Sequence, residues 1–309
     1  MSKNTSAIIS PKQGSVWKDP VTHMSFIWIE HGCFMMGQTE SEKRQLIQEA
    51  LEEIYNKYFK TKLPLHEVNV DGFWIGQYQV TVGQFRRFVQ ETGYKTEAEK
   101  EGWAWFFDGK DWEKENGVFW QSPGFSQEHD HPVVCVSWND AMALCQWLNN
   151  KGNGTFRLPT ETEWEYACRG GTKSIRFWGD DPDMACQYAN VCDKTFQKKF
   201  PDLSWKSHDC DCGYVFTSPA GIYQPNPFNL YDMLGNVWEW CMDHFSEDAY
   251  NKHEHDSPIY EENGVSFRVV RGGGWFNARW FVRSAGRYGF VQNDRYGDLG
   301  FRLLRTIKP

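Results

Sequence analysis

Aromatic side chains crowd the parts of this chain where no regular period can be found. The 309 residues include 16 Trp, 13 Tyr and 22 Phe, and many of these rings stand beside Gly and Asn. Large irregular segments need apolar anchors on a folded body, so the chain is constrained to long, ordered loops. Two interpretations stay open for the rings: they fasten loops to the body, or they form a ligand surface of rigid side chains.

The charge balance excludes some classes of partner. The formal net charge is −8, the isoelectric point is near 5.6, and no stripe of Lys and Arg is present. Nucleic acids and anionic membrane surfaces are held mainly by clustered Lys and Arg, so neither is expected. No apolar stretch approaches the length of a membrane span. The expected partner is a protein or a small-molecule ligand of unknown identity.

Residues 1–20 form a polar lead-in without the apolar core of a secretory signal. A single domain is expected over residues 21–309, because composition shows no break there and one domain can reach this size. The nine cysteines are odd in number and most stand in apolar runs, which favours buried thiols over a disulfide framework. Cytoplasmic residence is expected, or exposure at the cell surface if a signal has been removed.

Periodicity predicts strands and helices mainly in the first half of the chain. Residues 24–30 and 66–75 have the composition and alternation of strands, and residues 131–137 form a short apolar run that predicts another. Residues 41–60 carry apolar side chains on one helical face. Residues 93–131 have no dominant period but many rings, so a long ordered loop is expected there.

Capping boxes mark the starts of helices. Thr81 stands three residues before Gln84, and Thr160 three residues before Glu163, so each pair can satisfy backbone N–H groups at a helix start. After residue 171 helix signals fade and short β runs separated by turn residues take over. The helices expected on this basis cover residues 82–92, 138–149 and the segment from Thr160 to Gly170.

Six motifs appear in order, and together they carry a resemblance. They are GFWIGQYQVT (72–81), HPVVCVSW (131–138), RLPTETEWEYACRGG (157–171), NLYDMLGNVWEW (229–240), RVVRGGGW (268–275) and LGFRLL (299–304). This series resembles the formylglycine-generating enzyme, or sulfatase-modifying-factor, family over about residues 24–305. The resemblance implies an α+β, loop-rich fold of the C-type-lectin type, which agrees with early helices and late short strands.

The resemblance also implies what the chain lacks. The family's oxidase uses two cysteines, five residues apart, to bind copper and convert a substrate Cys to formylglycine. The matching positions hold Asn277 and Val282, and no cysteine follows Cys241. Soft thiolates select Cu(I), so copper is not expected as a cofactor and formylglycine generation is disfavoured.

One calcium ion is expected from the family's pattern. The matching ligands are the side chains of Asp232 and Glu239 and the carbonyls of Gly235 and Val237. These are the hard oxygen ligands that Ca²⁺ prefers. The alternative is an empty turn in which the carboxylates accept local hydrogen bonds.

A second family calcium site matches only in part, at Asn190, Val191 and Tyr214. Cys212 occupies the position of the expected acid, and Asp211 stands one residue early. The same region contains three cysteines and a histidine, which could indicate a zinc site or a redox pair. The indication is weak, because C-x-C is a poor zinc signature. The four residues are Cys192, His208, Cys210 and Cys212.

Other family branches are iron enzymes with histidine ligands on an added helical domain, for which this chain has no room. His253 and His255 stand two apart in a polar run, which is more typical of a solvated loop than of a metal site.

Without copper ligands, the segment from Trp275 to Asp298 becomes the expected binding surface. Its rings alternate with Gly, Asn and Asp, the composition of a paratope. Neighbouring framework residues are expected to carry the packing: Arg271, Gly272, Gly273, Arg283, Ala285, Arg287, Gly300, Phe301 and Arg302. The candidate ligand-binding residues, expected to be largely exposed, are Trp275, Phe276, Asn277, Trp280, Phe281, Tyr288, Phe290, Val291, Asn293, Tyr296 and Asp298.

The framework around these positions also resembles the variable segment of proteins diversified by retroelements. Changeable sites in such proteins derive from Asn codons, and changes at the adenines of that codon reach several residues found here, Gly286 and Gly289 among them. The function expected for the chain is thus a non-oxidase binding scaffold. The alternative is an enzyme of the same family with non-copper chemistry, oxidoreductase or tautomerase-like, using carboxylates such as Glu239, Asp243 or Asp294 with Arg295.

Overall fold

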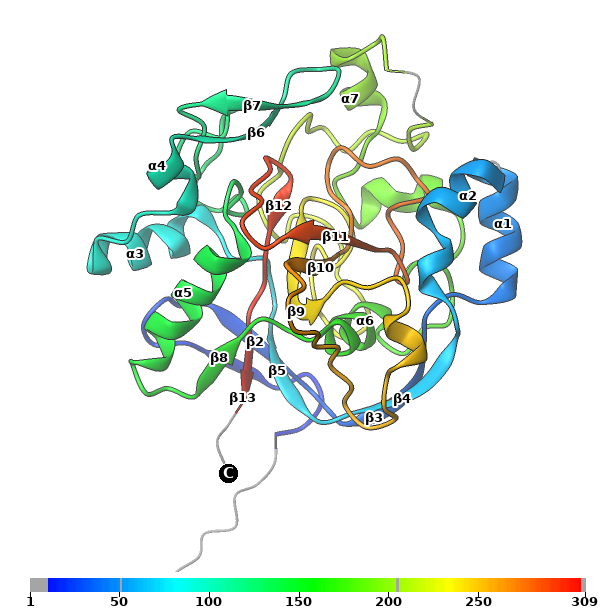
Figure 1. Cartoon of the computed structure of the whole chain (residues 1–309), viewed down its shortest axis with the longest axis horizontal. Helices are drawn as coiled ribbons and strands as arrows, with labels where there is room; N and C mark the ends of the chain where they lie inside the picture. The colour runs from blue at the N-terminus through cyan, green and yellow to red at the C-terminus, as the bar shows by residue number, and fades with distance from the viewer. Residues whose placement is uncertain (1–10, 51, 204–205, 307–309) are drawn as a thin grey trace, which may run out of the picture.

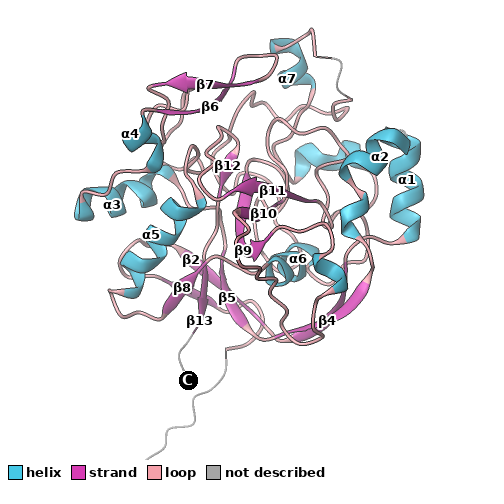
Figure 2. Ribbon diagram, viewed as in Figure 1, coloured by secondary structure: helices cyan, strands magenta, loops and turns pink. Residues whose placement is uncertain are grey.

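The computed structural model describes residues 11–306 except residue 51 and residues 204–205. Helices and strands are short, and loops make up much of the path between them (Figure 2). One sheet has the strand order β1-β2-β5-β13-β8 and a second the order β11-β10-β9-β12, and two further pairs, β3-β4 and β6-β7, stand apart. This is the α+β organisation that the sequence predicts. Within the described residues, no helix has the length and apolar character to cross a membrane.

The five-stranded sheet brings together segments from both ends of the chain. Neighbouring strands all pair antiparallel, and β13 lies between β5 and β8 (Figure 1). The sheet is therefore completed by residues close to the carboxyl end. β1 falls inside the predicted lead-in, so the folded body begins before residue 21. The strands are β1 (Val16–Lys18), β2 (Ser25–Ile29), β5 (Phe73–Gly76), β13 (Leu304–Thr306) and β8 (Thr155–Arg157).

The four-stranded sheet occupies the middle of the molecule (Figure 1). Its inner strands β9 (Trp238–His244) and β10 (Phe267–Arg271) are antiparallel, and the two-residue β12 (Leu299–Gly300) joins β9 in parallel. β11 (Arg287–Val291) pairs with the other side of β10. The remaining strands are β3 (Gly32–Met36), β4 (His66–Val70), β6 (Trp103–Phe107) and β7 (Trp112–Asn116).

The structure confirms the two helix starts that the capping boxes predict. α3 (Val82–Thr92) begins after Thr81, whose hydroxyl accepts from the backbone N–H of Gln84, and α6 (Glu161–Arg169) begins in the same way after Thr160. α5 (Trp138–Asn149) opens with a box of Ser137 and Asp140, and covers the predicted range. The other helices are α1 (Glu40–Ala50), α2 (Glu52–Tyr58), α4 (Glu97–Glu101), α7 (Lys194–Lys199), and the short 3₁₀ turns η1 (Lys60–Lys62), η2 (Pro182–Gln187) and η3 (Ala249–Asn251).

Two sequence predictions are wrong. Residues 131–137 form no strand, because Cys135 adopts a φ of 57°, which breaks extended geometry. Residues 93–131 are not one loop but contain α4 and the hairpin β6-β7. The hairpin shows no alternation in sequence because β6 is apolar throughout and β7 is mostly charged.

Buried arginines tie the carboxyl-terminal loops to the body. Arg287 Nε donates to Glu161 Oε1 at 2.6 Å, and Arg271 forms an ion pair with Glu165, in surroundings without exposed surface on either side chain. All nine residues predicted as framework are buried, which confirms their packing role. Since a buried charge without its partner is strongly destabilising, each of these pairs depends on both members.

Candidate functional site

A cavity of about 660 Å³ opens where several distant segments meet. The loop between β10 and β11 forms one wall, the hairpin β6-β7 a second, and α2 a third. Strands β9 and β11 and the loop before β12 contribute the floor. Its lining residues are Ile54, Tyr58, Trp105, Asp111, Trp112, Trp238, Phe276, Asn277, Ala278, Trp280, Phe281, Tyr288, Phe290, Tyr296 and Asp298.

Eight of the eleven predicted ligand-binding residues line this cavity, namely Phe276, Asn277, Trp280, Phe281, Tyr288, Phe290, Tyr296 and Asp298. Trp275 does not, because it is buried in an aromatic cluster beneath the loop. Val291 and Asn293 also lie outside the lining. The expectation of a largely exposed surface is wrong: of the eleven, only Tyr288 and Asn293 are exposed, because the segment folds inward as the wall of a cavity.

The rings of the cavity pack on one another in stacked, tilted and edge-to-face pairs. Tyr296 stacks on Trp105 with 5.4 Å between ring centroids and meets Trp112 at 5.2 Å and an interplanar angle of 86°. Phe290 packs on Tyr296 at 4.8 Å and on Tyr288 at 5.3 Å. Such contacts fix ring orientation, so the cavity is formed before any ligand enters.

Few polar groups stand among these rings. Asp298 is buried, and burial raises the pKa of its carboxyl to about 7. Among the described residues, no side chain donates a hydrogen bond to this carboxyl. Asp111 is exposed at the rim. A cavity with aromatic walls and carboxyl groups favours positively charged ligands, because ring faces and carboxylates both attract cations.

The sequence analysis missed the cavity residues outside the carboxyl-terminal segment. Trp105, Asp111 and Trp112 come from the hairpin that was predicted as a loop, and Tyr58 comes from α2. The aromatic density of residues 103–112 was the available signal, but nothing local shows which distant segment those rings face.

The positions that match the family's copper cysteines do not fit a copper ion. Asn277 Oδ1 accepts a hydrogen bond from the backbone N–H of Gly274 at 2.7 Å, so it acts as a local turn brace. Val282 is fully buried and a Cβ on Gly273 would meet it at 3.2 Å, which places it in packing. Neither offers the soft ligand that copper needs.

At two glycines of the predicted variable segment, the surrounding structure leaves no space for other side chains. A Cβ on Gly286 would lie 2.7 Å from the carbonyl oxygen of Phe281, and one on Gly289 would lie 2.5 Å from the Phe245 ring. Contacts this short force neighbouring atoms to move. Gly286 and Gly289 thus have a packing reason to be glycine.

Oxygen atoms of the four residues predicted to bind calcium converge on one point, although Asp232 contributes its backbone carbonyl there and not the side chain that was predicted. Gln79 Nε2 sits there, 3.2 Å from the carbonyls of Asp232 and Val237, 3.5 Å from that of Gly235 and 3.0 Å from Glu239 Oε1. An amide carries two hydrogens and cannot serve four acceptors. Gln79 Oε1 and Asp232 Oδ1 are buried and have no hydrogen-bond partner, so the oxygen-rich cluster fits a hard cation.

The second predicted calcium site is less complete. Asn190 Nδ2 donates to the carbonyl of Phe216 at 2.6 Å, and its Oδ1 is buried without a partner. The carboxylate near this region belongs to Asp193, whose oxygens accept from backbone N–H groups of Phe196 and Cys212. Asp193 was not predicted, because it stands outside the family's matching positions.

The cysteine cluster differs from the prediction in its members. Cys210 and Cys212 lie against Cys186, and these three thiols are the group of potential metal ligands that the described residues bring together. His208 instead contacts the carbonyl of Cys192 through Nδ1 at 3.1 Å. Cys186 was missed because it is distant in sequence from the C-x-C pair.

The two histidines of the polar run have separate surroundings. His253 Nδ1 lies 3.1 Å from His66 Nε2, whereas His255 is exposed beside Glu67 and Asp256. The described residues around them form no group of three potential ligands. This is the solvated loop that the sequence favours for His255, while His253 is packed in the body.

The carboxylates named for a non-copper enzyme are already engaged elsewhere. Glu239 pairs with Arg302, Asp243 accepts from the backbone N–H groups of Glu161 and Tyr260, and Asp294 accepts from that of Val291. None of them lines the cavity, whereas Asp298 does.

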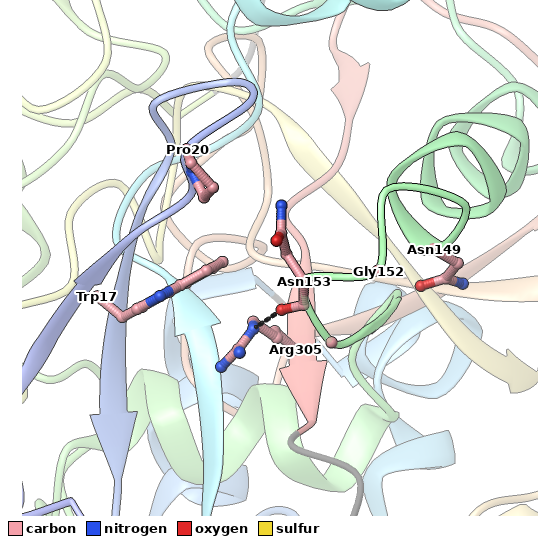
Figure 3. A pocket seen from close by; sticks show the side chains of 7 residues that line it. Trp17, Pro20, Asn149, Gly152, Asn153 and Arg305 are labelled. Atoms are coloured by element: carbon pink, nitrogen blue, oxygen red, sulfur yellow. Dashed lines mark hydrogen bonds between the residues drawn. The ribbon is translucent and has the colours of Figure 1, made fainter.

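A second cavity, of about 490 Å³, lies at the edge of the five-stranded sheet (Figure 3). Its cationic group is Arg305, whose guanidinium covers the Trp17 ring at 3.9 Å and whose Nε donates to the carbonyl of Asn153 at 2.7 Å. Because its one charged side chain is engaged with the protein itself, this cavity offers little to a ligand.

Comparison with known proteins places these observations in a family. The profile of the sulfatase-modifying factor enzyme 1-like domain matches residues 12–307. The formylglycine-generating enzyme of Mus musculus is 32% identical over 322 residues, covering 94% of this chain and 77% of that protein. The inactive C-alpha-formylglycine-generating enzyme 2 of the same organism is 33% identical over 271 residues, covering 79% of this chain and 78% of that protein.

 The solved structure of PvdO from Pseudomonas aeruginosa superposes with a TM-score of 0.76 at 26% identity, covering 96% of this chain and all of that one.

Proposed function

The chain belongs to the sulfatase-modifying factor family and has its C-type-lectin-like α+β fold, and from this premise we propose that its aromatic cavity binds a small organic cation. The observation that carries the proposal is the aromatic lining around the buried carboxyl of Asp298. The family provides the scaffold, while the ligand is inferred from the cavity's own chemistry.

The cavity suits a compact ammonium group. Tyr296, Trp105 and Trp112 present ring faces and edges to the same space, and ring faces attract cations within about 6 Å of the centroid. Asp298 adds a negative charge whenever its carboxyl is ionised. A volume of about 660 Å³ is that of a small-molecule site rather than a folded protein partner.

The proposed function does not include formylglycine generation. Asn277 and Val282 provide an amide oxygen engaged in a turn and a buried aliphatic group where that chemistry needs two thiolates. One relative of 33% identity is itself described as inactive, so the scaffold also exists without this reaction.

We also propose one calcium ion, at the oxygen cluster of Asp232, Gly235, Val237 and Glu239. The unpartnered Asp232 Oδ1 and Gln79 Oε1 support it, since a cation would give both buried oxygens a partner. Its role would be structural, because the ion would join the loop before β9, which holds three of the four ligand residues, to Glu239 in β9.

A second candidate function is proton-transfer catalysis in the same cavity. It is favoured by the position of Asp298, which is buried in the cavity lining; this burial raises the pKa of its carboxyl to about 7, where an acid can both donate and accept protons. In this case a bound ligand would be a substrate, and replacing Asp298 by Asn would abolish turnover while leaving some binding.

The test uses two probes of equal shape and different charge, choline and its neutral analogue 3,3-dimethylbutan-1-ol. The full chain should bind choline more tightly by titration calorimetry and should be stabilised by it against heat. Asp298→Asn and Trp112→Ala should weaken this binding. Trp178→Ala is the matched control, because Trp178 stacks on Tyr188 away from the cavity. Equal binding of the two probes, or binding unaffected by both cavity variants, would overturn the proposal.

A further inference from the structure

Three cysteines from two separate segments meet beside the short turn η2. Cys186 belongs to η2, and Cys210 and Cys212 stand on a loop more than twenty residues later. Their sulfur atoms all lie within 4.8 Å of one another. Cys186 and Cys210 are half-buried and Cys212 is buried, so the group is sheltered yet reachable from solvent.

The loop that carries Cys210 and Cys212 is fixed on several sides. Tyr223 Oη donates to the carbonyl of Cys212 at 3.0 Å, and the backbone N–H of Lys194 donates to the carbonyl of Cys210 at 3.2 Å. Asp193 accepts from the backbone N–H of Cys212. These contacts hold the two thiols toward Cys186 without relying on the sulfur atoms themselves, which is how a preformed ligand set is built.

Valence limits what the three sulfurs can do with one another. Cys186 Sγ lies against the sulfur atoms of both partners, but a cysteine sulfur forms only one disulfide bond. A disulfide would always leave a third thiol in contact with it. A single metal ion, by contrast, can engage all three sulfurs at once.

We propose that Cys186, Cys210 and Cys212 bind one thiophilic cation, Zn²⁺ or Cu⁺, through three thiolates. This site is separate from the aromatic cavity, whose lining contains none of the three cysteines. Soft sulfur ligands select Zn²⁺ or Cu⁺ over Ca²⁺.

The basic side chains near the three cysteines are paired with carboxylates and do not neutralise the sulfur atoms. Lys194 is paired with Asp209 at 2.6 Å, and Arg279 with Asp183 at 3.0 Å, so neither cation is committed to the sulfurs. Asp193 Oδ2 lies 4.0 Å from Cys186 Sγ and adds negative charge to the same side. Three thiolates beside a carboxylate repel one another unless a cation lies between them, and Asp193 or water can complete the coordination of Zn²⁺.

The experiment uses the full chain, reduced without oxygen and freed of metal. Zn²⁺ is titrated in competition with a chromogenic chelator, and Cu⁺ in competition with bicinchoninate, so the two arms identify the preferred ion. We expect about one ion bound per chain, as in a structural thiolate site. The bound ion should protect Cys186, Cys210 and Cys212 from alkylation, as mapped by mass spectrometry of their peptides.

Variants separate this site from other thiols. C186S, C210S and C212S should each lose the bound ion, whereas C33S is the matched control because Cys33 is an exposed free cysteine. The protection measurement on the unchanged protein tests the site even if a serine variant fails to fold. No metal uptake by the reduced chain, or protection that falls on other cysteines, would overturn the proposal, as would uptake that all three variants retain.

Discussion

The guanidinium of Arg302 lies flat against the carboxylate of Glu239 in a paired contact, Nε to Oε2 at 2.6 Å and Nη2 to Oε1 at 2.7 Å. Both side chains are buried, and Trp164 Nε1 donates to the same carboxylate at 2.8 Å. Arg302 also donates to the carbonyls of Gly76 and Tyr231, so one side chain links β5 of one sheet, β9 of the other and the loop that contains Tyr231. The pair is central to both the fold and the proposed calcium cluster.

Removing one member of this pair should destabilise the protein strongly. R302L leaves the Glu239 carboxylate buried without its partner, and a loss of about 3–5 kcal/mol in the free energy of unfolding is expected. Chemical denaturation measures it. E91Q, which breaks an exposed contact with Lys151, is the control and should leave the midpoint nearly unchanged. A small effect of R302L would mean that the buried pair is not a main support of the fold.

Calcium should raise the thermal midpoint of the unchanged protein, because a ligand that binds only the folded state stabilises it. D232N keeps the side-chain shape but removes the charge, and should weaken the calcium-dependent rise. This variant is preferable to replacement of Glu239, which would also break the pair with Arg302. A midpoint that responds neither to calcium nor to chelator would show that the cluster is a self-sufficient turn.

The purified protein should not convert the Cys of a Cys-x-Pro-x-Arg peptide to formylglycine, with or without added copper. Asn277 and Val282 offer no thiolate at the positions that match the oxidase. Mass spectrometry of the peptide detects the aldehyde, and an active formylglycine-generating enzyme is the positive control. Copper-dependent aldehyde above background would contradict the structural argument.

Choline affinity should rise between about pH 6 and pH 8, because the carboxyl of Asp298 ionises near 7. Without ligand the sign is opposite. The folded chain holds this proton to a higher pH than the unfolded chain, whose carboxyl ionises near 3.8, so the free energy of unfolding falls as pH rises from about 4 to about 7 and levels off above that. D298N should flatten both dependences in calorimetry and in thermal unfolding. An unchanged slope in that variant would assign the titration to another group.

Two tyrosines of the cavity should differ in their cost to stability. Tyr288 is exposed, so Y288A should change the unfolding free energy little, on the order of 0.5 kcal/mol. Tyr296 stacks on Trp105 and packs on Phe290, so Y296A should cost more, about 1–3 kcal/mol. Both should weaken choline binding. Equal stability losses would show that Tyr288 also fastens its strand.

Local chemistry made much of the fold predictable from the sequence. The boxes at Thr81 and Thr160 mark helix starts because capping depends on residues three apart, and the strand at residues 24–30 shows its own apolar pattern. The short strand expected at 131–137 was wrong because the φ of Cys135 is set by tertiary contacts and leaves no trace in composition.

The candidate site was predictable only on the side that one segment provides. Nine residues from Phe276 to Asp298 line the cavity, and eight of them were predicted, since they stand in a single aromatic run. Trp105 and Trp112 belong to a hairpin with no alternation, and the meeting of Cys186 with Cys210 depends on a loop closure. Both are pairings between distant segments, which periodicity in one sequence does not record.

The position of β13 between β5 and β8 has a consequence for synthesis on the ribosome. Translation delivers β1, β2, β5 and β8 long before β13, and the sheet cannot close around a strand that is still inside the exit tunnel. For most of its synthesis the nascent chain therefore exposes the unpaired edges of β5 and β8, the kind of surface that invites wrong pairing. The five-stranded sheet is thus expected to close, and its dependence on chaperones to end, only once Leu304–Thr306 have left the exit tunnel.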